Sequence, residues 1–288
     1  SWFRTVKKIC VFMPDIVIFS YWNPFFAPCF GFIARKLKHR IGREKIISIC
    51  HNIIPHERSF IDKILIKYYL KPFNKFICMS SFVEKELKLF KTNFKSVVRF
   101  LPINETTNPI IQDPDYKSTF RNEMNIGSSD KIILFFGLIR PYKGLDTLLF
   151  AIEKTFKYIS NSKLIIAGEA YENKDKYISI IKQLKIEDRV IWFDRFISQD
   201  EVMKLMLLSD LLVLPYKFAS QSGVLSQAWQ YNLPTIVSDA GGLPEYIDNK
   251  ESGYIIESGD SEDLSKKISN FFKSDDNVRM SEYIKNNK

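Results

Sequence analysis

The chain alternates short apolar runs with longer amphipathic stretches over most of its length. In the second half, apolar runs rich in β-branched residues predict strands at 131–137, 163–168, 189–193, 211–215, 234–238 and 253–256. Between these runs, apolar residues recur at helical spacing and predict helices at about 144–159, 173–184, 199–209, 222–232 and 261–273. Continuous apolar strands separated by helices are typical of a parallel sheet covered on both faces.

The first third repeats this pattern with fewer strands. Strands are predicted at 15–19, 45–50, 75–79 and 96–101, and helices at about 25–40, 59–72 and 81–91. Residues 102–118 carry three prolines among polar residues, which indicates a linker. We therefore expect an α/β protein with two Rossmann-like, doubly wound parallel-sheet domains facing a cleft, at residues 1–115 and 116–288.

The two ends of the chain carry separate expectations. The first domain is expected to be incomplete at its N-terminus, because the chain opens in an amphipathic stretch before the first strand and no Gly-rich turn follows that strand. The C-terminal helix or tail at 274–288 is a candidate to return to the first domain. The uncharged run from Ile16 to Ala34 is interrupted by Pro24 and Pro28, so we do not expect it to span a membrane.

Charge is distributed unevenly along the sequence. The formal net charge is +9, yet residues 1–100 hold 19 Lys and Arg against 6 Asp and Glu. This asymmetry indicates a negatively charged partner, such as a membrane surface, a phosphorylated substrate or nucleic acid; a generally Lys-rich composition is the alternative. The four cysteines have neither Cys-x-x-Cys nor metal-ligand spacing and are expected to be reduced thiols.

Several common catalytic motifs are missing from the sequence. It has no Gly-x-Gly-x-x-Gly after a strand and no Gly-x-x-x-x-Gly-Lys-Ser/Thr. These absences argue against a dinucleotide-binding dehydrogenase and a P-loop enzyme. No Ser/His/Asp arrangement or His-Glu-x-x-His appears either. A phosphate-bearing ligand would therefore need a different kind of binding loop.

The loop that follows the strand at 131–137 is the first candidate for such a site. It contains Gly137, Arg140 and Lys143 and leads directly into a helix. A helix N-terminus favours an anion, and the two cations would add positive charge, so a diphosphate is a natural ligand. The alternative is that both cations are ordinary solvated loop residues.

A second loop of the same physical type follows the strand at 211–215. Ser222 is placed to cap the next helix, and Gly223 allows a ligand to approach the backbone. The amides of the first turn would bind an anion, and several polar side chains could bond hydroxyl groups. The residues concerned are Ser220, Gln221, Ser222, Gly223, Val224, Leu225 and Gln227. An ordinary capped helix without a ligand is the alternative.

Two further loops follow strands in the same way. After 234–238, a Gly-Gly turn with Gly242 leads to a short helix whose first turn holds Glu245. After 45–50, His51 and His56 lie at the carboxyl edge of the first sheet, where a histidine could bond a sugar hydroxyl or stabilise developing charge. A helix start without a ligand and a structural histidine are the respective alternatives.

Taken together, these stretches resemble the retaining glycosyltransferases of family 4, which have the two-domain GT-B fold. The matching phrases run in the family's order over about 131–273. They are Gly137–Gly144, Lys163–Gly168, Ser209–Pro215, Pro234–Glu245 and Ser252–Tyr254, and His51 and Met79–Ser81 match the first domain. The resemblance implies a hexosyltransferase that moves a sugar from a nucleotide-diphosphate donor to a glycan or lipid-linked acceptor, with retention and without a metal or other cofactor. Cell-surface polysaccharide assembly is the implied setting, in the cytoplasm or peripherally on the inner membrane face.

The resemblance also implies roles for individual residues. Lys143 would neutralise the donor diphosphate, and His51 would contact the transferred sugar. The family's arginine falls on Leu138, so Arg140 is expected to replace it from two residues further on. The second Glu of the family's Glu–seven residues–Glu motif falls on Gln227, and the first falls near Ala219 or Ser220. That departure leaves a different donor, replacement by Gln221, or weakened activity open.

Two outlying groups complete the candidate site. Arg195 and Phe196 follow the strand at 189–193 and are expected near the donor's base. Lys63, Lys67 and Lys71 recur every four residues on one helical face, and a second basic cluster includes Arg35 and Lys36. Family members with lipid-linked acceptors dock on the anionic inner leaflet through such faces.

Other functions remain open at this stage. A non-catalytic sugar-nucleotide binder would explain the missing Glu, and a GT-B-like sugar-nucleotide epimerase would use the same donor loops with carboxylates for proton transfer. A solvated basic face is the alternative to membrane docking. Nucleic acid is not expected as a partner, because the basic stretches match no nucleic-acid-binding motif.

Overall fold

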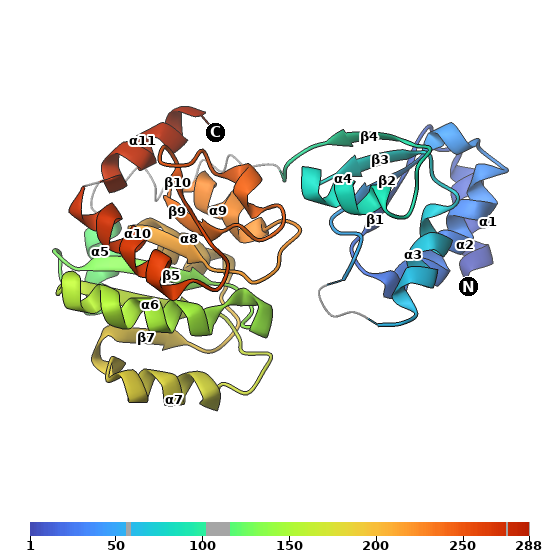
Figure 1. The fold of residues 1–288 in the computed structure, drawn as a ribbon. Helices are drawn as coiled ribbons and strands as arrows, with labels where there is room; N and C mark the ends of the chain where they lie inside the picture. Colours follow the sequence, from blue (N-terminus) through green and yellow to red (C-terminus); the bar gives the residue numbers. More distant parts are fainter. Residues whose placement is uncertain (56–58, 102–115, 275, 288) are drawn as a thin grey trace. The chain divides into compact units, whose positions relative to one another are not determined.

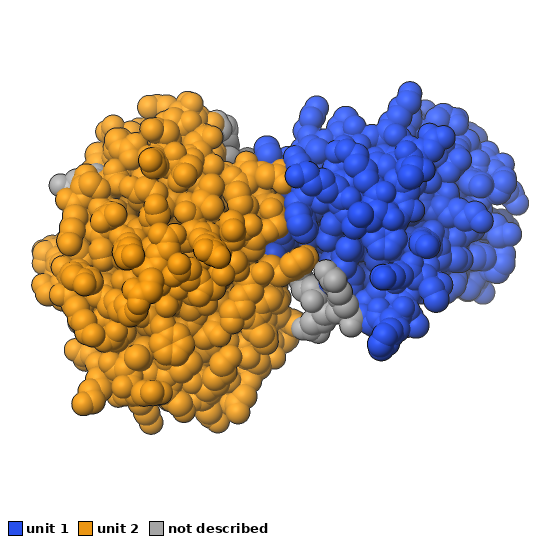
Figure 2. Space-filling view, viewed as in Figure 1, with its two compact units in different colours: residues 1–101, 219–221 blue, residues 102–218, 222–288 orange. Residues whose placement is uncertain are grey.

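The computed structural model describes residues 1–55, 59–101, 116–274 and 276–287 (Figure 1). The chain divides into two compact units (Figure 2). Unit 1 comprises residues 1–101 together with 219–221, and unit 2 comprises residues 102–218 and 222–288. Most of the linker expected at 102–118 lies outside the described residues. Its last residues instead begin a helix of unit 2, α5 (Tyr116–Glu123).

Unit 1 is built on a parallel four-stranded sheet in the order β1-β2-β3-β4. The strands are β1 (Val17–Tyr21), β2 (Ile46–Cys50), β3 (Lys75–Cys78) and β4 (Lys95–Val98). The helices are α1 (Trp2–Phe12), η1 (Pro24–Phe26), α2 (Ala27–Lys38), η2 (Arg43–Lys45), α3 (Asp62–Leu70) and α4 (Ser81–Lys88). The unit's core includes a stacked pair, Tyr21 and Tyr69, with ring centroids 4.1 Å apart.

Unit 2 has a parallel six-stranded sheet in the order β10-β9-β8-β5-β6-β7. The strands are β5 (Lys131–Phe136), β6 (Ser162–Ala167), β7 (Val190–Phe193), β8 (Leu211–Leu214), β9 (Thr235–Ser238) and β10 (Gly253–Ile256). Apart from α5, its helices are η4 (Pro141–Lys143), α6 (Leu145–Tyr158), α7 (Asp175–Leu184), η5 (Glu187–Arg189), α8 (Gln199–Leu208), α9 (Gly223–Gln230), η6 (Leu243–Tyr246), α10 (Ser261–Lys273) and α11 (Asp276–Asn287).

The sequence pattern explains why these elements form. The central strands β8 and β9 are buried along their whole length, as expected for parallel strands covered on both faces. Helix α8 begins with a capping box, in which Ser198 and Glu201 each bond the other's backbone amide. Asp260 caps α10 by accepting from the amides of Glu262 and Asp263.

Helix α11 packs within unit 2. Tyr254 donates a hydrogen bond to Asp276, and Arg279 pairs with Glu251 at 3.0 Å. Tyr283 donates to Asp248 at 2.8 Å. Within the parts of the chain that the structure describes, none of the helices combines the length and apolar character needed to cross a bilayer.

The strand order of unit 2 reverses at its centre. From β5 the chain adds β6 and then β7 on one side, whereas β8, β9 and β10 are added on the other. β5 and β8 are therefore neighbours at a topological switch point. In doubly wound sheets, ligands bind at the carboxyl ends of the strands at this point. The loops after β5 and β8 are those that the sequence marks as anion sites.

Candidate donor site in unit 2

The loop after β5 and the start of α9 meet at Gly137. This residue has φ +114°, and a Cβ placed on it would lie 3.3 Å from Lys143 Nζ and 3.5 Å from Val224 Cγ2. A side chain at this position would therefore crowd the Lys143 ammonium and touch Val224. The structure brings together three of the predicted site residues, Gly137, Lys143 and Val224, from two separate loops.

The same two loops are also in contact at Gly144, which has φ +70° and precedes α6. A Cβ on Gly144 would lie 1.9 Å from the carbonyl oxygen of Pro215, so glycine is required both by its backbone conformation and by the lack of space. The loops are further joined by the amide of Lys217, which donates to the carbonyl of Tyr142 at 2.7 Å. Contact between the loops fixes the position of Lys143.

Lys143 is a buried cation with a neutral partner. Its residue is 9% exposed, and its Nζ donates a hydrogen bond to the hydroxyl of Tyr216 at 2.7 Å. Among the residues that the structure describes, no carboxylate forms an ion pair with this ammonium. A buried charge is usually paired, because leaving water is costly. The arrangement can accommodate the negative charge of a ligand.

Tyr216 was not singled out from the sequence, although it lies two residues after the strand that ends at Leu214. Its carbonyl accepts hydrogen bonds from the hydroxyls of Ser238 and Ser258. Its ring lies edge-on to that of Tyr142, with centroids 6.3 Å apart. These contacts hold the phenol in place under Lys143. An aromatic residue at the carboxyl end of a central strand was the available sequence signal.

Arg140, the second predicted cation, occupies the extended residue that precedes η4. It is half-buried, and its guanidinium carbon lies 5.1 Å from the centroid of the Tyr171 ring. Leu138, where the family's arginine would fall, is 45% exposed. Arg140 therefore belongs to the same loop as Lys143, and its role toward a ligand stays a prediction.

The N-terminus of α9 differs in one respect from expectation. Ser222 lies at the N-cap position, but its side chain makes no capping hydrogen bond. An added Cβ at Gly223 would meet no heavy atom within 4 Å, so the backbone is approachable there. The predicted open approach at Gly223 is present, whereas the predicted cap by Ser222 is wrong. Leu225 is buried beneath this first turn, and Gln227 is half-buried one turn later.

Several buried polar atoms near this helix have no hydrogen-bond partner among the residues that the structure describes. Ser220 Oγ and Gln221 Oε1 precede α9, and Ser226 Oγ and Trp229 Nε1 lie on it. Ser220 and Gln221 group with unit 1, where the hydroxyl of Ser80 donates to the carbonyl of Ser220 at 2.8 Å. Leaving such groups unpaired costs about 1–3 kcal/mol each, and a polar ligand would offset that cost.

The loops after β7 and β9 hold the remaining donor-side candidates. Arg195 is exposed and bonded to Glu201, and this bond is the main reason that the pKa of Glu201 falls to about 2. Arg195 would have to leave this carboxylate to reach a ligand, and Phe196 is 77% exposed. Gly242 precedes η6, which is a single 3-10 turn, so the helix-dipole argument for Glu245 weakens.

In unit 1, His51 follows β2 at the carboxyl edge of the sheet. Its Nε2 lies 2.9 Å from Ser20 Oγ, and its amide donates to the carbonyl of Tyr21 at 2.9 Å. Burial lowers the pKa of its imidazole from the ordinary 6.5, which favours the neutral ring. The buried carboxylate of Glu86, not marked by the sequence, accepts from the amides of Ile53 and Ile54 at 3.3 Å and holds the following loop. His56 lies outside the described residues.

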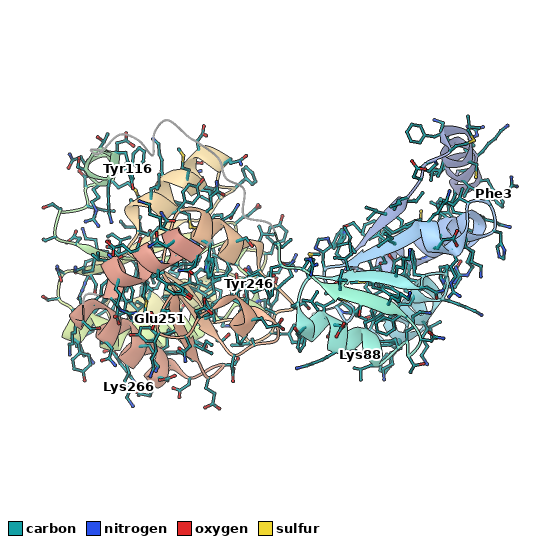
Figure 3. The ribbon with its side chains drawn as sticks, turned by 90° about the horizontal axis from the view of Figure 1, so that it is seen from above. Phe3, Lys88, Tyr116, Tyr246, Glu251 and Lys266 are labelled. Atoms are coloured by element: carbon teal, nitrogen blue, oxygen red, sulfur yellow. The ribbon has the colours of Figure 1, made fainter. Side chains whose placement is uncertain are left out.

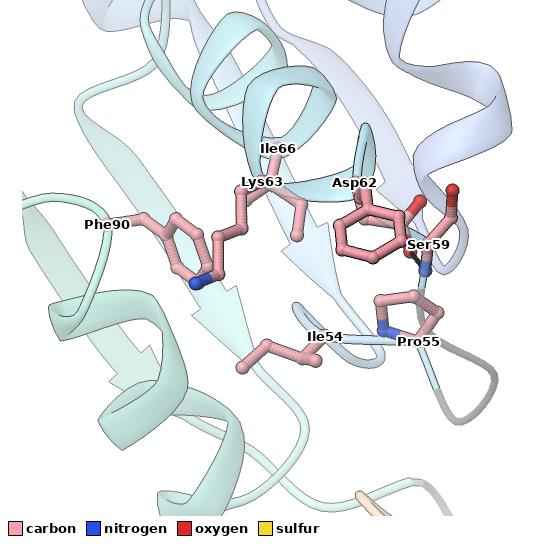
Figure 4. A pocket seen from close by; sticks show the side chains of 8 residues that line it. Ile54, Pro55, Ser59, Asp62, Lys63, Ile66 and Phe90 are labelled. Atoms are coloured by element: carbon pink, nitrogen blue, oxygen red, sulfur yellow. Dashed lines mark hydrogen bonds between the residues drawn. The ribbon is translucent and has the colours of Figure 1, made fainter.

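A pocket of about 450 Å³ lies beside this loop. Figure 4 shows Lys63 extending from α3 into the pocket, which Ile54, Ile66 and Phe90 also line. Among the described residues that line it, most are apolar, and Lys63 and Asp62 are charged. Such a pocket can hold an apolar group next to an anion.

The predicted basic face is exposed: Lys63 and Lys67 lie on α3, and Lys71 is the residue that directly follows it. Arg35 departs from the expected outward position. Its guanidinium carbon lies 3.5 Å from the centroid of the Tyr68 ring and it bonds the Tyr68 carbonyl, since α2 packs against α3 at this point. Lys36 is exposed and lies 5.9 Å from the ring centroid of Phe3.

Among the described residues, no group of three or more His, Cys, Asp or Glu side chains is placed to hold a metal ion. Independence from metal stays a prediction from the resemblance. The cysteines are free thiols, two of them, Cys50 and Cys78, buried in register on neighbouring strands.

Comparison with known proteins gives the family. The sequence model of the glycosyl transferases group 1 family matches residues 117–288. Over 141 residues the chain is 31% identical to N-acetyl-alpha-D-glucosaminyl L-malate synthase of Bacillus anthracis, covering 49% of this chain and 36% of that protein. Over 170 residues it is 25% identical to D-inositol 3-phosphate glycosyltransferase of Segniliparus rotundus, covering 58% and 37%. The chain thus matches little more than a third of the length of these curated relatives.

Solved structures show the same fold. Anabaena HepE, in a crystal structure with UDP-glucose, superposes with a TM-score of 0.79 at 16% identity, covering 98% of this chain and 75% of that one. The lipopolysaccharide outer core galactosyltransferase WaaB superposes with a TM-score of 0.71 at 18% identity, covering 99% and 74%. The expected GT-B fold, with two parallel-sheet α/β domains, is confirmed. The chain belongs to the glycosyl transferases group 1 family.

Proposed function

We propose that this chain transfers a sugar from a nucleoside-diphosphate donor to a glycan or lipid-linked acceptor, with retention of the anomeric configuration. The observation that carries the proposal is Lys143, a buried ammonium whose hydrogen-bond partner is the neutral hydroxyl of Tyr216. It lies at the switch point of the unit 2 sheet, beside the loop that leads to the approachable backbone at Gly223. A diphosphate would supply the negative charge that this arrangement accommodates.

The chemistry follows from where charge develops. The bond between the anomeric carbon and the diphosphate oxygen breaks through an oxocarbenium-like transition state, and the bonding electron pair stays on the diphosphate. Lys143, Arg140 and the amides at the start of α9 would stabilise that negative charge. The departing phosphate takes the proton of the acceptor hydroxyl, whose oxygen then bonds the anomeric carbon on the same face. No side-chain base is required for this route.

The polar residues around α9 would recognise the rest of the donor. The unpartnered oxygens of Ser220 and Gln221 are suited to sugar hydroxyls, and Gln227 to a ribose hydroxyl. His51 is assigned contact with the transferred sugar, as the resemblance implies. Its lowered pKa keeps the imidazole neutral, so it can bond a hydroxyl without adding charge.

Two of the relatives support this reading by name. One acts as a glucosaminyl L-malate synthase and another as an inositol 3-phosphate glycosyltransferase, and the superposed Anabaena protein was crystallised with UDP-glucose. We extend the proposal to cell-surface polysaccharide assembly at the cytoplasmic side of the membrane. The exposed lysines of α3, next to the exposed Ile61 and Ile64, would meet anionic headgroups there.

The first experiment is a thermal-shift screen of the chain against UDP, GDP, ADP and their common sugar conjugates. We expect one base to raise the melting temperature and its sugar conjugate to raise it further, through binding to the folded state. Lys143→Met should abolish the shift, whereas Lys182→Met on α7 should keep it. Transfer to an acceptor, with the product anomer read by NMR, then tests retention.

A second function is favoured by one departure from the family pattern. By the resemblance, the family's first glutamate falls near Ala219 or Ser220 and its second on Gln227 of α9, so neither implied carboxylate is present to engage the donor. A non-catalytic sugar-nucleotide binder would show the thermal shift but no transfer with any acceptor. An epimerase would convert the donor in the absence of an acceptor.

Liposome flotation, with and without anionic lipid, tests the membrane proposal. We expect the chain to float only with vesicles that contain anionic lipid, and binding that does not depend on anionic lipid would refute the proposal.

A further inference from the structure

A second charged site lies on unit 2, away from the loops after β5 and β8 that form the candidate donor site. Figure 1 shows α6 and α10 side by side over one face of the sheet. A pocket of about 470 Å³ opens between them. The described residues that line it include one carboxylate, Glu262, and four lysines, Lys154, Lys157, Lys266 and Lys273.

The positive charge of this pocket is only partly neutralised. Lys154 pairs with Glu262, and Lys157 pairs with Glu153. No carboxylate of the described ranges forms an ion pair with Lys266 or Lys273. Figure 3 shows Lys266 reaching outward from the surface of unit 2. Like charges held close together favour an anion between them.

A buried hydroxyl in the same pocket also lacks a partner. Ser269 is 6% exposed, and its Oγ makes no hydrogen bond in the part of the chain that is described. Its neighbour one turn earlier is different, since Ser265 Oγ lies 3.4 Å from the hydroxyl of Thr155. Lysines near helix C-termini are common and need no ligand. A buried hydroxyl without a partner, on a residue that lines a basic pocket, is not explained that way.

We propose that this groove, defined by Lys154, Lys157, Lys266, Ser269 and Lys273, binds the phosphate groups of a small soluble molecule. The hydroxyl of Ser269 donates to a phosphate oxygen, and the ammonium groups of Lys266 and Lys273 neutralise the phosphate charge. The volume suits a small molecule, since ligand pockets are usually about 300–1,000 Å³. The site is distinct from the donor loops, because it lies along the second half of α6 while Lys143 precedes that helix.

Lysine footprinting on the full chain tests this proposal. The protein is pulsed with an acetylating reagent, with and without inorganic pyrophosphate, and the acetylation of each lysine is read by mass spectrometry. We expect pyrophosphate to slow modification of Lys266 and Lys273 at least threefold. The exposed Lys182 on α7 and Lys185 directly after this helix serve as controls and should be unaffected.

Two variants separate this site from the donor site. In Lys143→Met, which removes the donor-site cation, pyrophosphate should still protect Lys266 and Lys273 from acetylation. If that protection disappears in the variant, pyrophosphate binds at the donor loops, and the proposal is overturned. In Ser269→Ala, the pyrophosphate concentration for half protection should rise about fivefold, the effect of losing one hydrogen bond. An unchanged melting temperature for Ser269→Ala verifies that it is folded.

The remaining outcomes are equally decisive. Equal acetylation with and without pyrophosphate would refute phosphate binding in the groove. Protection of Lys182 and Lys185 to the same degree would mean that pyrophosphate acts by general screening. Protection by phosphatidylglycerol vesicles alone would replace the soluble ligand by a membrane surface and overturn the proposal.

Discussion

The substitution Lys143→Met separates the effect of this lysine on the stability of the free protein from its effect on donor binding. The ammonium is 9% exposed and bonded to the neutral hydroxyl of Tyr216. Methionine has a similar length and needs no solvation, so it removes a buried charge that has no carboxylate partner in the described residues. Burying an ion costs several kcal/mol in lost solvation, which exceeds the cost of about 1–3 kcal/mol for leaving the Tyr216 hydroxyl without its partner. We therefore expect the melting temperature of the free protein to stay the same or rise.

Binding of the donor should change in the opposite direction. Two unit charges about 4 Å apart interact with about 4 kcal/mol at the effective dielectric constant of 20 that suits such sites. At about 1.36 kcal/mol per tenfold, the loss corresponds to about three orders of magnitude in the stabilisation of the leaving diphosphate. We expect kcat/KM for sugar transfer to fall by about 100- to 1,000-fold, as when one oxyanion donor is removed.

The assay pairs thermal unfolding with transfer kinetics on the same protein. The matched control, Lys182→Met, removes an exposed lysine of α7 and should change neither quantity. If Lys143→Met lowers the melting temperature of the free protein and leaves the nucleotide-induced shift intact, the lysine is a structural residue. That result would refute the reasoning from burial and charge.

Three further predictions rest on single contacts. Gly144→Ala should destabilise the protein by about 2 kcal/mol or more in urea unfolding, because the residue has φ +70° and the new methyl would lie 1.9 Å from a carbonyl oxygen. In the control Gly223→Ala, the new methyl would meet no heavy atom of the described residues within 4 Å, and stability should change by less than about 1 kcal/mol. Burial lowers the pKa of His51 in the folded state, so the unfolded chain binds more protons and the free energy of unfolding should fall as the pH drops below 6.5. The variant His51→Gln should lose this part of the pH dependence. Parallel profiles of stability against pH for the two proteins would contradict the prediction. Asp210→Ala should lower the free energy of unfolding by about 3–5 kcal/mol, because it leaves the buried Arg121 guanidinium, 3.3 Å away, without its carboxylate. A loss below about 1 kcal/mol would show that the backbone carbonyls bonded to Arg121 are enough to stabilise its charge.

The sequence predicted most elements of unit 2 to within one or two residues. Its central strands β8 and β9 are buried along their whole length, so each is a continuous apolar run that ends where the polar loop begins. The prediction was less accurate at the edge of the unit 1 sheet, where β1 (Val17–Tyr21) begins two residues later than expected. An edge strand is half-exposed, and its limits are set by pairing with β2, which is a tertiary contact.

Helix α5 was missed for a related reason. Its sequence is polar and follows several prolines, so local propensity indicates a linker. The helix is held by Arg121, which donates to the carbonyls of Gly127, Ser128 and Asp130 and pairs with the distant Asp210. A contact between residues 89 positions apart cannot be inferred from a local pattern.

The sequence by itself determined the α/β class, the order of strands and helices, and the residue types of the anion-binding loops, because periodicity and loop composition are local properties. Only the tertiary structure decided which loops meet: the sheet order places β5 beside β8 and so brings Gly137, Lys143 and Val224 together. It also placed Tyr216 under the lysine and turned Arg35 onto Tyr68. Strand order and helix packing depend on contacts between distant segments, and these have no counterpart in the spacing of residues along the chain.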